Sequence, residues 1–318
     1  YAFPVCSRGE KGMKKSVFFI AAAIFCAAVC AGFTACTASG AHEHTYSEEW
    51  AFDKTYHWHA AICGHTDETS GKAKHVFEGD VCAVCGYSAV STGLEYRLNA
   101  DGNGYVVAGR GTAAGDIVIP AEYNDLPVTA IGRRAFEDAS IKSVTIPFGV
   151  TDIEGSAFMG CDALQRVVIP ESVTSIGASA FSGCAALAEI DLPSGIGTIE
   201  NYTFSGCVAL TGITIPAGVT RIEKSAFEGC ASLTDITIPD CVSSIGNSAF
   251  FNCGSLENVT MGVGITRIES WAFRECASLG SIVYAGTREQ WNAVEKEFMW
   301  DRDTVGYTVY CADGEIAY

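Results

Sequence analysis

Residues 225–239 read SAFEGCASLTDITIP, and close copies of this stretch recur along most of the 318-residue chain. Its phenylalanine, Phe227, has a counterpart in every copy. The full series consists of Phe136, Phe158, Phe181, Phe204, Phe227, Phe250 and Phe273. A fixed period of about 23 residues predicts a solenoid, in which each repeat buries its apolar face against its neighbours.

Each repeat has the pattern of one short strand followed by a return path. Ile236 and Ile238 alternate with polar residues, as in a strand with one buried face. Pro239 ends that strand because proline cannot donate to a continuing ladder. Val242 and Ile245, with their copies, are expected to return the chain along a second wall. The fold class is therefore a repeat solenoid, mostly β, with turns or single helical turns that place each phenylalanine in the core.

Six cysteines recur with the same period, three residues after a phenylalanine. They are Cys161, Cys184, Cys207, Cys230, Cys253 and Cys276. Side chains in equivalent positions of stacked repeats point the same way, so their Cβ vectors do not converge as a disulfide requires. We expect these cysteines to be inert packing residues, because buried free cysteine behaves as a small hydrophobe. Cys241 and Cys311 lie outside this ladder and stay unassigned.

The repeats resemble the BspA-like, treponemal-type class of bacterial leucine-rich repeats, over about Gly93 to Tyr318. The ends fit this class too. Residues 93–128 contain a hairpin signal around Gly102, which would cap the first turn of an array at 129–283. Residues 284–318 resemble the family's terminal unit, with a capping box from Thr287 to Gln290 and a closing strand. The resemblance implies an exported surface protein that attaches to host matrix proteins or to other bacteria.

Two rows of side chains lie between the buried positions of the strands and are expected to point outward. From these rows we predict a ligand-facing surface made of Thr145, Arg166, Glu189, Asp191, Thr214, Asp235, Thr237, Asn258 and Thr260. The alternative is a solvated strand face, where threonine is present because it suits a strand.

The N-terminal part has the pattern of an export signal. Two lysines after Met13 precede an apolar run that ends at Phe33. We expect residues 13–36 to be the signal and residues 1–12 to be an overcall of the start site. The run leads into a sequence that resembles a bacterial lipobox, so Cys36 is expected to carry lipid and hold the protein to the membrane. Plain secretion and a retained membrane anchor remain alternatives.

Residues 42–88 have the composition of a small metal module, because they contain all six histidines of the chain and three cysteines. Zinc takes four ligands from thiolates and imidazoles, and a two-residue spacer lets one turn present two thiolates. We predict a structural zinc ion held by Cys63, His65, Cys82 and Cys85, with His44, His57, His59 and His75 as alternates. A Cys82–Cys85 disulfide with solvated histidines is the main alternative, and a zinc-dependent enzyme in this segment is another.

Charge and composition exclude several functions. A net charge of −17 argues against nucleic acid as a partner, because phosphate binding needs clustered basic residues. The array has no histidine and no phosphate-binding loop, so we expect no enzyme there. The sequence indicates a cell-surface binding protein for an extracellular or cell-surface protein or a glycan, anchored to the membrane by an N-terminal lipid. A structural role in envelope assembly stays open.

Overall fold

The computed structural model describes residues 90–304 and 306–318 in full. Of the part before residue 90 it describes only five strands. The chain divides into two compact units, one within Ser7–Ala89 and the other containing Val90–Tyr318. No helix in the described ranges is long and apolar enough to cross a membrane. The predicted leader and Cys36 lie outside the described residues.

The first unit contains short antiparallel strands. Strands β1 (Tyr46–Phe52), β2 (Tyr56–Ala61) and β3 (Thr69–Lys74) form a sheet in that order. Strands β4 (Phe77–Glu78) and β5 (Val81–Cys82) form a hairpin. Among the predicted zinc ligands and their alternates, His57 and His59 lie in β2 and Cys82 ends β5. The others, Cys63, His65, Cys85, His44 and His75, lie outside the described residues.

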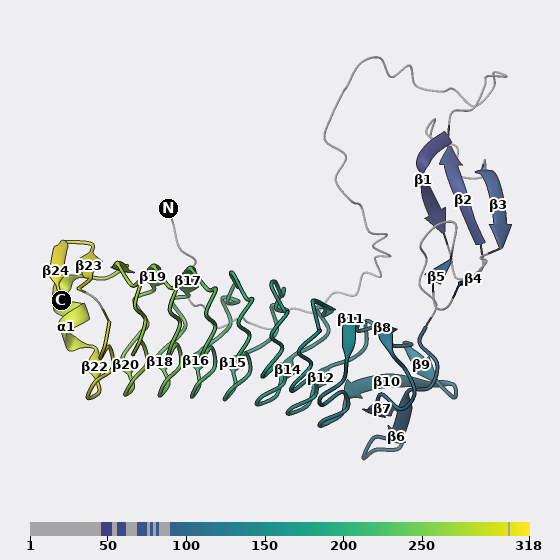
Figure 1. Cartoon of the computed structure of the whole chain (residues 1–318), viewed down its shortest axis with the longest axis horizontal. Coiled ribbons are helices and arrows are strands. Elements are labelled where there is room, and N and C mark those ends of the chain that lie inside the picture. Colours follow the sequence, from purple (N-terminus) through teal and green to yellow (C-terminus); the bar gives the residue numbers. More distant parts are fainter. Residues whose placement is uncertain are drawn as a thin grey trace, which may run out of the picture. The chain divides into compact units, whose positions relative to one another are not determined.

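The second unit is a mostly-β solenoid of about nine turns (Figure 1). It begins with the predicted hairpin, which the structure confirms as antiparallel pairing of β6 (Glu95–Leu98) with β7 (Tyr105–Gly109). Strand β10 (Leu126–Ile131) then pairs parallel to β7 and antiparallel to β9 (Glu122–Tyr123). The hairpin therefore covers the first turn, which would otherwise expose a strand edge.

Each complete turn contributes to two walls, along the upper and lower edges of the solenoid in Figure 1. The upper wall, here called the strand face, contains β8 (Gly115–Val118), β11 (Ile141–Thr145), β13 (Arg166–Val168), β17 (Asp235–Ile238), β19 (Asn258–Met261), β21 (Ser281–Tyr284) and β23 (Thr308–Cys311). The lower wall, here called the return wall, consists of two separate ladders. The first runs from β10 through β12 (Asp152–Ile153) to β14 (Ser175–Ile176), and the second contains β15 (Thr198–Ile199), β16 (Arg221–Ile222), β18 (Ser244–Ile245), β20 (Arg267–Ile268) and β22 (Glu295–Lys296), with no strand pairing between β14 and β15.

A column of stacked phenylalanines forms the centre of the core. All seven rings of the series are fully buried. The centroids of neighbouring rings lie 5.1 to 5.7 Å apart, and the ring planes lie within 13° of parallel. At the C-terminal end Trp300 meets Phe273 edge-on at 6.1 Å and ends the column. This spacing sets the rise from one turn to the next.

The ladder cysteines lie beside this column as buried free thiols. Each one also donates a hydrogen bond that the sequence analysis did not anticipate. The Sγ of Cys207, for example, donates to the main-chain carbonyl of Phe181 at 3.2 Å, and the other five repeat this contact with the phenylalanine of the preceding turn. The thiol therefore satisfies a buried carbonyl in addition to filling space.

The segment that carries each phenylalanine is a series of hydrogen-bonded turns, not a helical turn. The residue two positions before each ring has a left-handed backbone, as at Ser225 with φ of 53°. The residue two positions after each ring is also left-handed, as at Gly206 with φ of 75°. Two left-handed residues in such a short corner prevent helix propagation.

The C-terminal cap contains α1 (Arg288–Ala293), the one α-helix in the described part of the chain. The predicted capping box is confirmed, since Thr287 accepts the main-chain N–H of Gln290 and the Gln290 side chain accepts the N–H of Thr287. Trp291 on this helix is fully buried against the last turn. The predicted closing strand is β23, and an additional strand, β24 (Gly314–Ala317), folds back on it antiparallel.

Removal of one stacked ring should destabilise the array. Phe204→Ala is expected to lower the free energy of unfolding by about 3–5 kcal/mol, because it removes a fully buried ring and leaves a cavity. The matched control is Phe148→Ala, because the Phe148 side chain is 79% exposed. Urea denaturation followed by circular dichroism measures both. Similar losses in the free energy of unfolding for the two variants would contradict a stabilising role for the stacked phenylalanines.

The ladder thiols should be unreactive in the folded protein. Burial raises the pKa of Cys161 to about 11 and the pKa of Cys207 and Cys276 to about 12. Because the thiolate is the reacting form, iodoacetamide at pH 8 should spare the six ladder cysteines until urea unfolds the array. Peptide mapping by mass spectrometry identifies the labelled sites, and half-buried Cys311 is the internal comparison. Native labelling of the ladder as fast as Cys311 would contradict this expectation.

Candidate functional site

The predicted ligand-facing side chains all lie on the strand face, on the outward side of the alternation. All are exposed except Thr260, which is half-buried. They form two rows that run along the solenoid. The first row contains Arg166, Glu189, Asp235 and Asn258, and the second contains Thr145, Asp191, Thr214, Thr237 and Thr260. The register of β17 with β19 pairs Asp235 with Asn258 and Thr237 with Thr260, so equivalent positions lie side by side.

The strand face is interrupted in the middle of the array. Glu189–Leu192 and Gly212–Ile215 occupy strand positions between β13 and β17, yet neither segment forms a strand. No main-chain N–H or carbonyl of these two segments hydrogen-bonds to another described residue. The expectation of a strand in every repeat is therefore wrong at these two repeats.

The interruption coincides with the widest step in the core. The centroids of Phe181 and Phe204 lie 5.7 Å apart, against 5.1 Å at either end of the column. The corner turns stay bonded across this step, because the N–H of Phe181 donates to the carbonyl of Thr203 at 2.9 Å. Gly212 also lies within the interrupted strand face, where glycine weakens a strand. The turns thus remain stacked at their corners, while the ladders of both walls open at this step.

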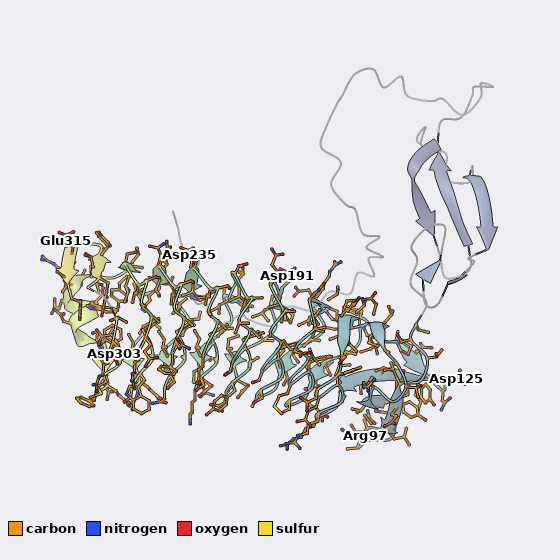
Figure 2. The ribbon with its side chains drawn as sticks, in the orientation of Figure 1. Arg97, Asp125, Asp191, Asp235, Asp303 and Glu315 are labelled. Atoms are coloured by element: carbon orange, nitrogen blue, oxygen red, sulfur yellow. The ribbon has the colours of Figure 1, made fainter. Side chains whose placement is uncertain are left out.

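A hollow of about 660 Å³ lies over the interruption. Its lining comprises Glu189, Ile190, Asp191, Thr211, Gly212, Ile213, Thr214, Ile215, Asp235 and Thr237. Five of these are side chains that the sequence analysis assigned to the ligand-facing surface. Figure 2 shows Asp191 and Asp235 on the same edge of the solenoid. Among the described residues, the lining holds three carboxylates and no basic side chain.

Gly212 creates the space between two of these carboxylates. Glu189, Gly212 and Asp235 follow each other at intervals of one repeat, so they occupy one position in three successive turns. Glu189 and Asp235 therefore lie two turns apart, and the phenylalanine column rises by 5.7 and 5.4 Å over these two turns. A Cβ placed on Gly212 would meet no atom within 4 Å. Gly212 is not among the predicted ligand-facing residues. The sequence feature that could have indicated it is a glycine in a row of positions that otherwise carry side chains.

Asp235 is held in position by its neighbours. Asn258 donates from Nδ2 to its Oδ1 at 2.8 Å, and Ser281 in turn donates to Oδ1 of Asn258 at 2.8 Å. Hydrogen bonds from Asn258 and Thr234 lower the pKa of Asp235, so the carboxylate stays ionised at neutral pH. Glu189 and Asp191, by contrast, have no hydrogen bond or ion pair between their carboxylates and any other described residue. The hollow therefore offers one oriented and two free carboxylates.

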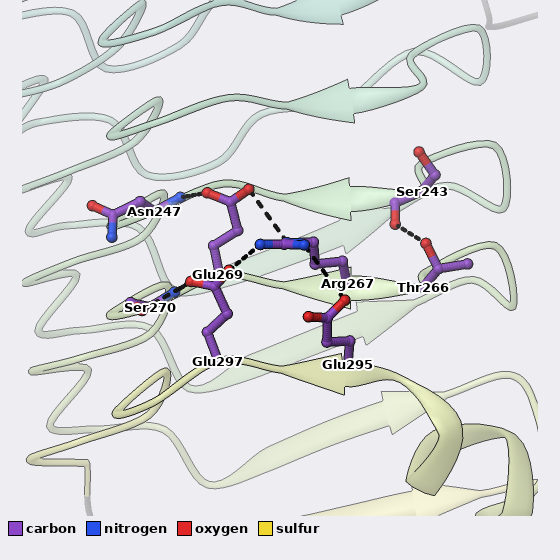
Figure 3. Close-up of polar contacts among 8 residues, drawn as sticks. All are labelled: Ser243, Asn247, Thr266, Arg267, Glu269, Ser270, Glu295 and Glu297. Atoms are coloured by element: carbon purple, nitrogen blue, oxygen red, sulfur yellow. Dashed lines mark hydrogen bonds and ion pairs between the residues drawn. The ribbon is translucent and has the colours of Figure 1, made fainter.

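A second acidic cluster, on the return wall, is neutralised within the protein (Figure 3). Arg267 contacts Glu295 at 3.4 Å, Glu269 at 3.6 Å and also Glu297. The other carboxylate oxygen of Glu297 accepts hydrogen bonds from the hydroxyl of Ser270 at 2.9 Å and from its main-chain N–H at 3.0 Å, and these bonds lower the pKa of Glu297. These glutamates hold successive turns together, so this cluster is structural. The hollow on the strand face has no such counter-charge from the described part of the chain.

Metal binding in the array has no geometric support. Within the ranges that the structure describes, no group of three or more His, Cys, Asp or Glu side chains is placed to hold a metal ion. Of the four predicted zinc ligands, Cys63, His65 and Cys85 lie outside the described residues, so the arrangement of the zinc site stays a prediction.

Comparison with known proteins identifies the repeats. The model of the BspA type leucine rich repeat region matches in six copies over residues 129–230 and 197–293, which together span just over half of the chain. No curated protein matches.

Solved structures similar to this chain are leucine-rich repeat proteins. One from T. pallidum is 26% identical, with 60% of this chain and 78% of that chain covered and a TM-score of 0.44. A leucine rich cell surface protein from Faecalibacterium prausnitzii A2-165 is 27% identical, with 66% and 73% covered and a TM-score of 0.46. The match to the BspA type leucine rich repeat region covers the repeats that form the solenoid and is sufficient to identify the family. The chain belongs to the BspA-type leucine-rich repeat family.

Proposed function

We propose that this protein is a non-catalytic binding protein of the cell surface, and that its strand face contacts a protein ligand. The observation that carries this proposal is the hollow, where Glu189 and Asp191 are exposed and no other described residue pairs with their carboxylates. Charged side chains that a protein leaves unneutralised in a concave site are available to a ligand. Members of the BspA-type family are typically exported or at the cell surface, which supports the location.

The proposal includes export by residues 13–36 and lipid attachment at Cys36. Its support is the order of a charged start, an apolar run and a small residue before cysteine. Stable anchoring needs two acyl chains or more, since a single chain holds a protein only weakly. A lipid at Cys36 would tether the chain to the membrane and leave the repeats free to meet a ligand.

A second candidate function is recognition of neighbouring envelope proteins, without any host ligand. The same strand face would serve it, because both functions need a protein-binding surface. A glycan is a further ligand class for this face. The ligand that binds in the following experiment distinguishes these candidates.

Filling the hollow should weaken binding of the ligand. The full chain is tested by surface plasmon resonance against fibronectin, laminin, collagen, immobilised glycans and solubilised bacterial envelope proteins. For the ligand that binds, Thr214→Tyr with Thr237→Tyr should weaken affinity by about tenfold or more, because both threonines line the hollow.

The matched control is Thr174→Tyr with Thr220→Tyr. Both of these threonines are exposed on the opposite edge, near β14 and β16 of the return wall. This pair should change the affinity by less than about twofold. Equal effects of the two pairs would contradict a binding role for the strand face. If only the immobilised glycans bind, the proposal of a protein ligand is wrong and the ligand class is a glycan.

We also propose that residues 42–88 hold a structural zinc ion. The support is the donor set, because three cysteines and six histidines gather in a segment too small to be stabilised by core burial alone. The metal would be held by Cys63, His65, Cys82 and Cys85.

Metal analysis under reducing conditions tests this assignment. The purified full chain should contain about one equivalent of zinc, and Cys82→Ser should lose most of it. Cys311→Ser is the control and should retain the metal, since Cys311 lies in β23 of the array. Less than about 0.2 equivalents in the unmodified chain would remove the zinc proposal and favour the Cys82–Cys85 disulfide.

A further inference from the structure

We propose that the hollow on the strand face binds the guanidinium group of an arginine that a protein partner presents, seated over Gly212 between Glu189 and Asp235. This inference rests on the proposed function of the strand face and names the chemistry of its partner. It follows from the charges of the first row, from the hydrogen-bonding groups in the hollow and from the space that Gly212 leaves.

The charges of the first row leave one position vacant. Arg166, Glu189, Gly212 and Asp235 occupy the same position in four successive turns. Opposite charges in directly neighbouring positions of paired strands attract each other, and like charges repel. A cation over Gly212 would lie between two carboxylates and continue the alternation of sign that Arg166 and Glu189 begin. Within the part of the chain that the structure describes, no basic side chain lines the hollow.

The hollow offers acceptors in the number that arginine needs. A guanidinium group has five N–H donors and no acceptor. Asp235 presents an ionised carboxylate that Asn258 orients at 2.8 Å, and the carboxylates of Glu189 and Asp191 have no partner among the described residues. The main-chain carbonyls of Gly212–Ile215 likewise accept no hydrogen bond from the described residues. Arginine makes such multiple bonds better than lysine, because its donors form a rigid planar fork.

The apolar part of the lining suits the rest of an arginine side chain. Ile213 is half-buried, and together with Ile190 and Ile215 it contributes to the lining of the hollow. Arginine packs its methylene stem on apolar surface and keeps its charged head among polar groups. A bound arginine would therefore use the isoleucines and the carboxylates at once.

A divalent cation fits the hollow less well than arginine does. Calcium or magnesium requires several oxygen ligands within about 2.0–2.6 Å of one point. Glu189 and Asp235 lie two turns apart, and these two turns are spaced by 5.7 and 5.4 Å at the phenylalanine column. An extended guanidinium group whose hydrogen bonds each add ~2.9 Å can reach both sides of such a gap.

The test uses a small probe and the full chain. Saturation-transfer NMR at low salt measures binding of the peptide Gly-Ser-Gly-Arg-Gly-Ser-Gly, with citrulline in place of arginine as the neutral isostere. A single arginine should bind with a dissociation constant on the order of 1 mM. The citrulline peptide should bind at least about fivefold more weakly, because it lacks the charge.

Gly212→Arg should block the site, because the introduced side chain takes the position of the partner's arginine. The fold should be retained, since a Cβ at Gly212 meets no atom within 4 Å. The matched control is Gly197→Arg near β15 of the return wall, where the space around the glycine is equally open. We expect at least about a fivefold loss of arginine-peptide binding for Gly212→Arg and less than a twofold change for Gly197→Arg.

A charge-matched pair of triple variants separates the site from the overall negative charge. Glu189→Gln with Asp191→Asn and Asp235→Asn should abolish binding. Glu122→Gln with Asp125→Asn and Glu289→Gln changes the net charge equally at exposed positions away from the hollow and should preserve binding.

Specific outcomes overturn the inference. No saturable binding of the arginine peptide, equal binding of the citrulline peptide, or equal losses for both triple variants would each do so. If the arginine peptide does not bind while the threonine variants of the strand face still weaken binding of a protein ligand, the proposed binding face is supported and the proposed arginine site is wrong. If the arginine peptide binds as expected and no protein or glycan ligand binds, the arginine site is supported and the proposed binding function of the strand face is contradicted.

Discussion

The stacking of one turn on the next, about 5 Å away, is the constraint on which the rest of this structure depends. The phenylalanine column sets that spacing, with centroids 5.1 to 5.7 Å apart. Hydrogen bonds between equivalent main-chain positions reinforce it along both walls and at the corner turns. Because each turn contacts only its neighbours, every other regular feature repeats at the same spacing. The cysteine thiols that bond to the carbonyls of the preceding turn are one such feature, and the outward rows of the strand face are another.

The candidate site is a departure from that regularity. At the widest step of the column the strand ladder opens, and Gly212 leaves a gap in the first row. A repeated surface presents the same chemistry at each turn and so gives a ligand no preferred register. A local break in the repeat gives a ligand a preferred position along the solenoid. The hollow also differs from the return wall in its charge, because Arg267 neutralises the glutamates there and no described basic residue lines the hollow.

The architecture of the array fits a protein that works by display. A solenoid has a large surface for its length. The β6–β7 hairpin at one end, and α1 and β24 at the other, cover the end turns of the array, which would otherwise expose strand edges to other chains. Membership of the BspA-type family agrees with such a role. A net charge of −17 favours encounters with positively charged molecules over encounters with anionic ones.

The sequence alone determined the period, the core and the ends of the solenoid. A buried ring in every repeat, alternating isoleucines and a proline after each strand are local patterns, and local patterns predict a repeat because each repeat faces the same environment. The hairpin around Gly102 and the capping box at Thr287 are also local, and both were predictable. Only the tertiary structure decided where the strand ladder opens, because that depends on small differences in spacing summed over several turns. It also decided that no described basic residue pairs with the two carboxylates on either side of Gly212. The choice between a free and a neutralised carboxylate depends on which side chains reach it from neighbouring turns, and spacing along the chain does not contain that information.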